Sequence, residues 1–149
     1  MPCSGEGMSL GRFVRPVITA RPDELIAEVA RKLRDHHVGC VVIEREGKAF
    51  GIVTDRDVAI RVVAAGLDAA TTKAQDVATL DPVVVRDIEG PETAARRMRE
   101  YGVRRLPVVD ERGTLRGIVT ADDLVRVLGG ELGDLSAGFE GSADSTDSR

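Results

Sequence analysis

Apolar residues along the chain form short runs that alternate with stretches of helical spacing. The stretch Val38–Phe50 (VGCVVIEREGKAF) is an apolar run, a charged turn with Gly47 and a short run into GIVT. The stretch Val103–Arg116 (VRRLPVVDERGTLR) repeats this order around Gly113. Two strand-length runs joined by a tight turn are typical of a β-hairpin. The pattern therefore predicts two hairpins of the same design.

Stretches with helical spacing surround each hairpin. Before the hairpins, the apolar positions are Leu25, Ile26, Val29, Ala30 and Leu33 in the first copy and Ala94, Ala95 and Met98 in the second. After them, the stripes are Val58, Ala59, Val62 and Val63, and Leu124, Val125 and Leu128. Gly66 and Gly129 are expected to end these two helices. Short β-like segments, Pro16–Thr19 and Pro82–Val85, open each copy, so each unit has the order strand–helix–strand–strand–helix.

One phrase recurs at the end of each hairpin: GIVTDRDV at Gly51–Val58 and GIVTADDL at Gly117–Leu124. The repeat predicts an N-terminal segment (1–11), a first unit (12–66), a linker (67–76), a second unit (77–130) and a flexible tail (131–149). Units of this size are marginally stable alone. We therefore expect an α+β fold in which two units, related by a pseudo-twofold axis, pack through small mixed sheets.

Composition narrows the class of protein. The chain has 149 residues, 42% of them hydrophobic and 31% charged, with a net charge of −4. This balance favours a soluble globular protein and disfavours nucleic acids and membrane surfaces as partners, since both usually require a basic face. No signal peptide or membrane-length apolar run is evident, so the sequence predicts a cytoplasmic protein without membrane partners.

The Thr and the Asp of the repeated phrase stand where a helix is expected to begin. Thr54 and Asp57, like Thr120 and Asp123, have the spacing of a capping box. A helix N-terminus also offers free N–H groups to a phosphate, and a carboxylate can bind the two hydroxyls of a ribose. The two roles are compatible. The duplication favours a ligand.

The paired phrase, the stretch RRLPVVDERGTLRGIVT and the order of elements resemble a cystathionine β-synthase (CBS) domain pair, also called a Bateman module. The resemblance spans residues 12–128 and is closest to small stand-alone CBS proteins. It implies a sensor of adenosine-containing ligands in which the Asp holds the ribose, the Thr lies near the phosphate, and basic residues of the partner unit hold the phosphates. AMP, ADP or ATP is the expected ligand, with S-adenosylmethionine and NAD less favoured, and no cofactor is required.

Carried over to this chain, the resemblance predicts two unequal clefts. The first would contain Thr54 and Asp57, with Ile52 near the base and Arg56 close by. Arg104 and Arg105 would face it from the partner strand, because guanidinium groups suit a phosphate. The second would contain Thr120 and Asp123 and would face Gly39 and Cys40, which carry no charge. The sequence thus predicts tighter binding at the first cleft.

Rival functions have weaker support. His36, His37 and Cys40 suggest zinc, but a fourth ligand is not evident unless Cys3 supplies it, so we expect no metal site. No set of nucleophile, histidine and acid is present, and we expect no catalytic residues and no enzyme. The basic run 95–105 is more simply a solvated helical face than a nucleic-acid site.

The sequence therefore predicts a regulatory module that binds an adenine nucleotide without catalysis. The alternative is a ligand-free structural or interaction module that acts through its helical faces. An ion pair from Asp57 to Arg104 or Arg105 across a collapsed cleft would favour this alternative. We also expect a homodimer formed through the helices at Asp55–Ala65 and Ala121–Leu128, and a protein target that receives the signal.

Overall fold

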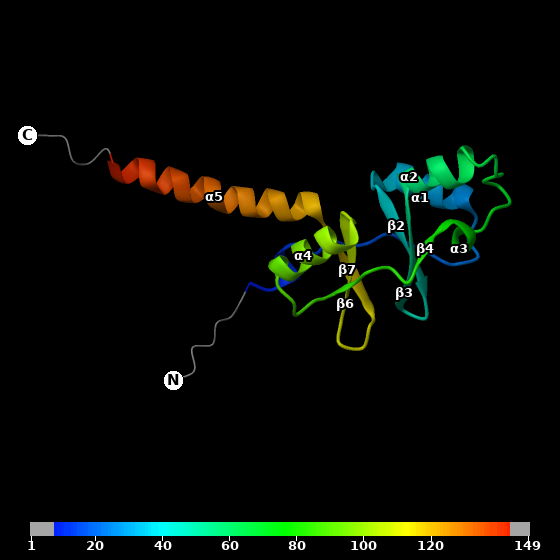
Figure 1. Ribbon diagram of the computed structural model, residues 1–149, viewed down its shortest axis with the longest axis horizontal. Helices are drawn as coiled ribbons and strands as arrows, with labels where there is room; N and C mark the ends of the chain where they lie inside the picture. The colour runs from blue at the N-terminus through cyan, green and yellow to red at the C-terminus, as the bar shows by residue number, and fades with distance from the viewer. Residues whose placement is uncertain (1–7, 144–149) are drawn as a thin grey trace, which may run out of the picture.

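The fold consists of two units, each built on a small mixed sheet (Figure 1). The computed structural model describes residues 8–143, with side chains for 8–130, 132 and 133. The first sheet has the order β1 (Thr19–Ala20), β2 (Cys40–Arg45), β3 (Lys48–Thr54) and β4 (Thr79–Leu80). The second has the order β5 (Val85–Arg86), β6 (Arg105–Val109) and β7 (Leu115–Thr120). The first pair in each sheet is parallel and the other pairs are antiparallel, which confirms the predicted α+β fold class.

Helices cover one face of each sheet. The first unit carries α1 (Ile26–His36), α2 (Asp55–Asp57) continued by the π-helical turns of η2 (Val58–Val63), and α3 (Ala74–Val77). The second carries α4 (Pro91–Tyr101) and the start of α5 (Ala121–Ala143), and the short helix η1 (Leu10–Arg12) lies near the N-terminus. The buried positions of α1 are Ile26, Val29 and Leu33, on the stripe expected from the sequence. Each unit thus has its own core between helices and sheet.

The last helix corrects one expectation. Gly129 does not end it, and α5 continues through the predicted flexible tail to Ala143. Figure 1 shows this continuation projecting away from both sheets. Residues 144–149 of the predicted tail lie outside the described residues. No helix within residues 8–143 combines the length and the apolar character needed to cross a membrane.

Two segments, one near the N-terminus and one between the units, pack against a unit other than the one their place in the sequence suggests. Leu10 precedes the predicted first unit and Phe13 is its second residue, but both are buried in the core of the second unit. Ala74 and Val77 of α3 adjoin the second unit in sequence but are buried in the core of the first. Each core is therefore completed by residues that the sequence places next to or within the other unit.

The glycine that opens each repeated phrase leaves room for a crossing segment. A Cβ atom on Gly117 would lie 2.5 Å from the carbonyl oxygen of Arg15, and one on Gly51 would lie 3.2 Å from that of Thr79. The backbone of Arg15 exchanges two hydrogen bonds with Ile118, of 2.9 and 3.0 Å. In the same way, β4 pairs with β3 beside Gly51. A side chain at either glycine would push the crossing backbone away.

The two sheets meet through a small apolar cluster of their own. Its buried members are Cys40 and Val42 of β2 and Ile118 of β7. The hairpin tips also meet, since the Leu115 N–H donates a 2.8 Å hydrogen bond to the carbonyl of Gly47. The predicted contact between the two sheets is therefore present.

We predict that Gly117→Ala destabilises the protein by about 1–3 kcal/mol, the usual cost of forcing atoms into a packed site. Gly129→Ala is the matched control, because a Cβ atom there would meet nothing within 4 Å in α5. It should leave stability unchanged or raise it by up to about 1 kcal/mol, as an exposed helical Gly→Ala change does. Urea unfolding followed by circular dichroism measures both. Equal stability of the two variants would contradict the role given to Gly117.

Candidate functional site

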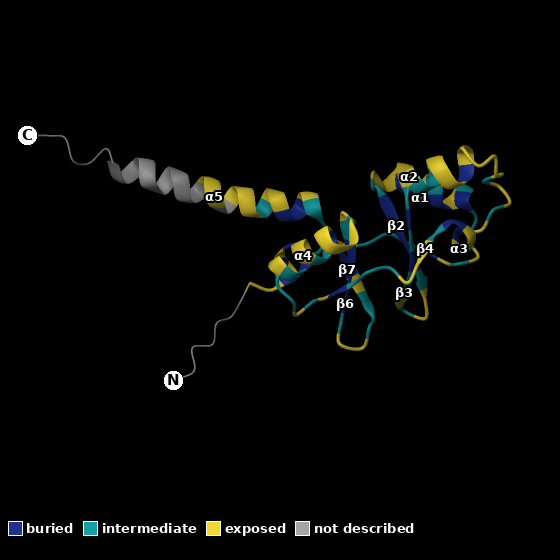
Figure 2. Cartoon of the chain, viewed as in Figure 1, coloured by how far each residue is buried: buried dark blue, intermediate teal, exposed yellow. Residues whose placement is uncertain are grey.

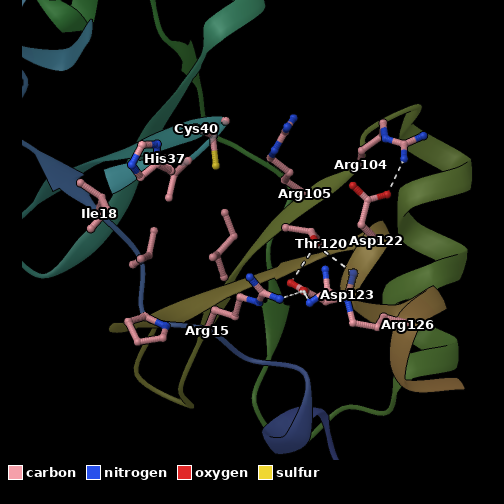
Figure 3. A pocket seen from close by; sticks show the side chains of 15 residues that line it. Arg15, Ile18, His37, Cys40, Arg104, Arg105, Thr120, Asp122, Asp123 and Arg126 are labelled. Atoms are coloured by element: carbon pink, nitrogen blue, oxygen red, sulfur yellow. Dashed lines mark hydrogen bonds and ion pairs between the residues drawn. The ribbon is translucent and has the colours of Figure 1, made fainter. Parts of the chain in front are cut away.

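A pocket of about 230 Å³ lies between the two units (Figure 3). The first unit contributes the segment before β1 and the junction of α1 with β2, and the second contributes the starts of β6 and α5 and the end of β7. The lining residues are Arg15, Pro16, Val17, Ile18, His37, Val38, Gly39, Cys40, Arg104, Arg105, Ile118, Thr120, Asp122, Asp123 and Arg126. We call this pocket the main cleft. It contains the Thr and the Asp of the second repeated phrase.

Asp123 is the buried carboxylate of the main cleft, only 5% exposed. Its backbone N–H donates to Thr120 Oγ1 at 3.1 Å, and the Thr120 hydroxyl donates to Asp123 Oδ2 at 2.8 Å. The other carboxylate oxygen, Oδ1, lies 2.6 Å from Nη2 of Arg15. Thr120 therefore caps the start of α5 by accepting from the Asp123 N–H, while the carboxylate of Asp123 faces the cleft.

Four arginines line the main cleft together with this carboxylate. Arg104 pairs with Asp122 at 2.8 Å, and Arg126 lies 4.0 Å from Asp123 in addition to the close Arg15. Arg105 has no ion pair within the part of the chain that the structure describes. With four arginines against two aspartates, the lining is positive overall, which favours an anionic ligand.

The first repeated phrase is built differently. The Asp57 N–H donates to Thr54 Oγ1 at 3.1 Å, and the Thr54 N–H donates to Asp57 Oδ2 at 2.9 Å, so both groups are used in a capping box. Asp57 also lies 3.6 Å from Arg61. The exposed Arg56 has its N–H bonded to Asp55 Oδ1. The capping interpretation accounts for this copy without a ligand.

A second pocket, of about 220 Å³, occupies the position related to the main cleft by the repeat. Its lining residues are Ile52, Thr79, Asp81, Pro82, Val83, Tyr101, Val103 and Arg105. We call it the minor cleft. Of the residues expected in the first cleft, it contains Ile52 and Arg105, whereas Thr54, Asp57, Arg56 and Arg104 are not part of its lining.

The predicted distribution of charge between the clefts is therefore corrected. Arg104 and Arg105 line the main cleft with Thr120 and Asp123, the cleft for which the sequence predicted no charge. The reason is that an arginine at the start of β6 stands next to Thr120, its neighbour across the β6–β7 pair. The ion pair expected of a collapsed first cleft does not form, because Asp57 faces Arg61 and Arg104 faces Asp122.

Sequence reasoning missed two arginines of the main cleft. Arg126 follows Asp123 by three residues on α5, and this helical spacing was a usable signal. Arg15 lies far from Asp123 in the sequence, and only the crossing of the N-terminal segment brings the two together. No local pattern marks that pairing.

Cys40 and the histidines form no metal site in the described part of the chain, where no cluster of three or more possible ligands occurs. Cys3, the further ligand considered, lies outside the described residues. Cys40 lies within the apolar cluster between the sheets, and burial raises the pKa of its thiol to about 11, although the positive charge of Arg105 opposes the shift. A neutral thiol of this kind is a poor nucleophile and a poor ligand.

Comparison with known families identifies both units. The sequence model of the CBS domain matches residues 11–64 and 74–130. The chain belongs to the CBS-domain family. Its two CBS units are the first and second units described above, and their arrangement is that of a CBS pair.

Two relatives represent the similarity in sequence. An uncharacterized protein of Methanopyrus kandleri is 40% identical over 122 residues, which cover 80% of this chain and 62% of that protein. The CBS domain-containing protein YhcV of Bacillus subtilis is 35% identical over 108 residues, covering 72% of this chain and 76% of YhcV. The chain thus spans less than two thirds of the Methanopyrus relative and most of YhcV.

Solved CBS structures share the fold. The CBS domain protein PAE2072 from Pyrobaculum aerophilum, complexed with AMP, is 30% identical with a TM-score of 0.68, over 73% of this chain and 83% of that one. The CBS domain pair of protein MJ0100, in complex with 5'-methylthioadenosine and S-adenosyl-L-methionine, is 29% identical with a TM-score of 0.74, over 83% and 97% of the two chains. These similarities confirm the predicted CBS-pair fold.

We predict that Cys40 reacts with iodoacetamide at least about tenfold more slowly in the native protein than in guanidinium chloride, because few molecules carry a thiolate at pH 8 and the thiol is buried. Cys3→Ser removes the second cysteine so that whole-protein mass spectrometry follows Cys40 alone. Equal rates of Cys40 alkylation in the native and the denatured protein would mean that the part of the main cleft next to Cys40 is open to solvent.

Proposed function

We propose that this CBS pair is a regulatory module that binds an adenine nucleotide in the main cleft and does not transform it. The observation that carries the proposal is the buried carboxylate of Asp123 at the start of a helix, in a cleft lined by four arginines. The carboxylate can accept hydrogen bonds from the two ribose hydroxyls, and the arginines together with the helix N-terminus can bind phosphate. The apolar residues Val17, Ile18 and Ile118 provide a surface for the base.

The binding of AMP by one structural neighbour and of adenosyl ligands by another supports an adenosine-type ligand. The charge of the main cleft favours a phosphorylated one. AMP, ADP and ATP are anions, whereas S-adenosylmethionine carries a sulfonium cation that four arginines would repel. We therefore place nucleotides before S-adenosylmethionine for this chain, with NAD as a less favoured ligand.

Thr54, Asp57 and Arg56 have a smaller part in this proposal than the sequence suggested. Thr54 and Asp57 satisfy each other in the capping box, and Asp57 lies outside the lining of the minor cleft. We assign the nucleotide to Thr120, Asp123, Arg104 and Arg105, with Arg15 and Arg126 added. Release of Asp123 from Arg15 would accompany binding.

We predict that AMP binds the wild-type protein, and that Asp123→Asn lowers its affinity about tenfold or more, as expected from losing one charge-assisted hydrogen bond. Asp57→Asn is the matched control and should change the affinity less than about twofold, because the Asp57 carboxylate lies outside the main cleft. Isothermal titration calorimetry measures both, with circular dichroism to check folding. A larger loss in Asp57→Asn than in Asp123→Asn would overturn the choice of cleft.

The charge argument has a separate test. Arg126→Ala removes an exposed guanidinium without disturbing the core, so it should weaken AMP binding by a factor of about three to ten and leave adenosine unchanged. S-adenosylmethionine should bind wild-type protein more weakly than AMP. Tighter binding of S-adenosylmethionine than of AMP would reverse the proposed ligand class.

A ligand-free interaction module remains the competing function, and the exposed helical faces are the observation in its favour. Ile60 (56% exposed) and Val63 (73%) lie on η2, and Val125 (71%) and Leu132 (67%) lie on α5. Figure 2 shows exposed positions along α5 before its grey part and on the helix that continues α2. Exposed apolar side chains that gather on a helical face are typical of an interaction surface. We propose that a second copy of the chain covers them, which is compatible with nucleotide binding.

We predict a dimer in light scattering at micromolar concentration, and a monomer for Val63→Asp, because a carboxylate would be buried without a partner in the interface. Ile88→Asp is the matched control: Ile88 is 70% exposed but belongs to the turn between β5 and α4 and to neither η2 nor α5, so this variant should remain dimeric. A monomeric wild-type protein would exclude the dimer and leave another protein as the occupant of these faces.

A further inference from the structure

Arg105 stands where the two clefts meet. Of the residues that line the main cleft and the minor cleft, Arg105 alone belongs to both linings. Its position at the start of β6, opposite Thr120, corresponds to that of Cys40 at the start of β2, opposite Thr54. The repeat thus places an arginine on one side of the interface and a small thiol on the other.

The guanidinium of Arg105 rests on Gly39 of the other unit. A Cβ atom built on Gly39 would lie 2.5 Å from Nη2 of Arg105, 3.3 Å from Cζ and 3.6 Å from Nε. No real side chain fits under the guanidinium at these distances. The absence of a side chain at residue 39 therefore allows Arg105 to extend from the second unit over the first, where it lines the main cleft on the side of Cys40 (Figure 3).

The minor cleft depends on the same side chain for positive charge. Apart from Arg105, its lining holds no arginine or lysine and includes Asp81. One guanidinium has a single forked set of donors and cannot bind phosphates in two separate clefts at once. When Arg105 extends over Gly39, the minor cleft presents a carboxylate and no cation to a phosphate.

We propose that Gly39 positions Arg105 as a single phosphate-binding group shared by the two clefts, so that the clefts exclude each other for phosphorylated ligands. The chain then binds one nucleotide tightly, in the main cleft, and the minor cleft accepts at most an adenosine-type ligand without phosphate. Gly39 is a positioning residue, and it determines specificity for phosphate through the place it gives to Arg105. This inference rests on the proposed function of the main cleft.

The experiment titrates the full chain with AMP and with adenosine by calorimetry, in the wild type and in Gly39→Ala. The added methyl group displaces the flexible end of Arg105 and leaves the ribose and base contacts in place. AMP affinity should fall about tenfold, the loss of one charge-assisted contact, while adenosine affinity should change less than about twofold. The wild type should bind one AMP per chain tightly. Gly129→Ala, the same substitution away from both clefts, should leave both affinities unchanged.

Arg105→Ala gives the same separation of AMP from adenosine without altering the backbone, and it keeps the test decisive if Gly39→Ala does not fold. Two AMP sites of equal affinity in the wild type, or equal AMP affinity in Gly39→Ala and the wild type, would overturn the inference and leave the proposed function standing. A wild-type protein that binds neither AMP nor adenosine would remove the proposed function, and the inference with it.

Discussion

The close passage of a backbone segment over the glycine of each repeated phrase is the constraint on which this structure depends. At Gly117 the N-terminal segment pairs with β7, and at Gly51 the central segment pairs with β3. Each segment also places an apolar side chain in a core: Phe13 is buried in the core of the second unit, and Val77 is buried in the core of the first unit. The units cannot separate without breaking these hydrogen bonds and exposing both cores to water. The clefts are therefore gaps within one interlocked body.

The same interlocking makes the two clefts electrostatically unequal. Arg15 stands directly before Pro16 in the main cleft, and Asp81 stands directly before Pro82 in the minor cleft. These equivalent positions therefore carry opposite charges at the two clefts. At the main cleft Arg15 reaches the carboxylate of Asp123. An aspartate at the equivalent place can offer Asp57 no such pair. Two copies of one phrase thus serve different purposes: the first caps a helix with both groups, and the second directs its carboxylate into a charged cleft.

The positive charge of the main cleft bears on the proposed function. Guanidinium groups close together repel one another, and pairing with two aspartates offsets only part of this repulsion. An anion would neutralise the remainder and bring contacts from both units to one molecule. Binding would therefore change how firmly the units are held together. The exposed faces of η2 and α5 belong to different units, so a partner that contacts both would sense that change.

Much of this protein could be predicted from local pattern. Periodicity placed the helices and hairpins, and the repeat predicted two packed units, because alternation and helical spacing reflect which side of an element faces a core. Capping chemistry at Thr54 and Asp57 could be derived from four consecutive residues. The end of α5 could not, since glycine lowers helix propensity without forbidding a helix. The pairing of Arg15 with Asp123 and the place of Arg105 against Gly39 depended on the tertiary structure alone. A long side chain can reach groups on either side of its strand, and which of them lies within reach is decided by how the crossing segments pack.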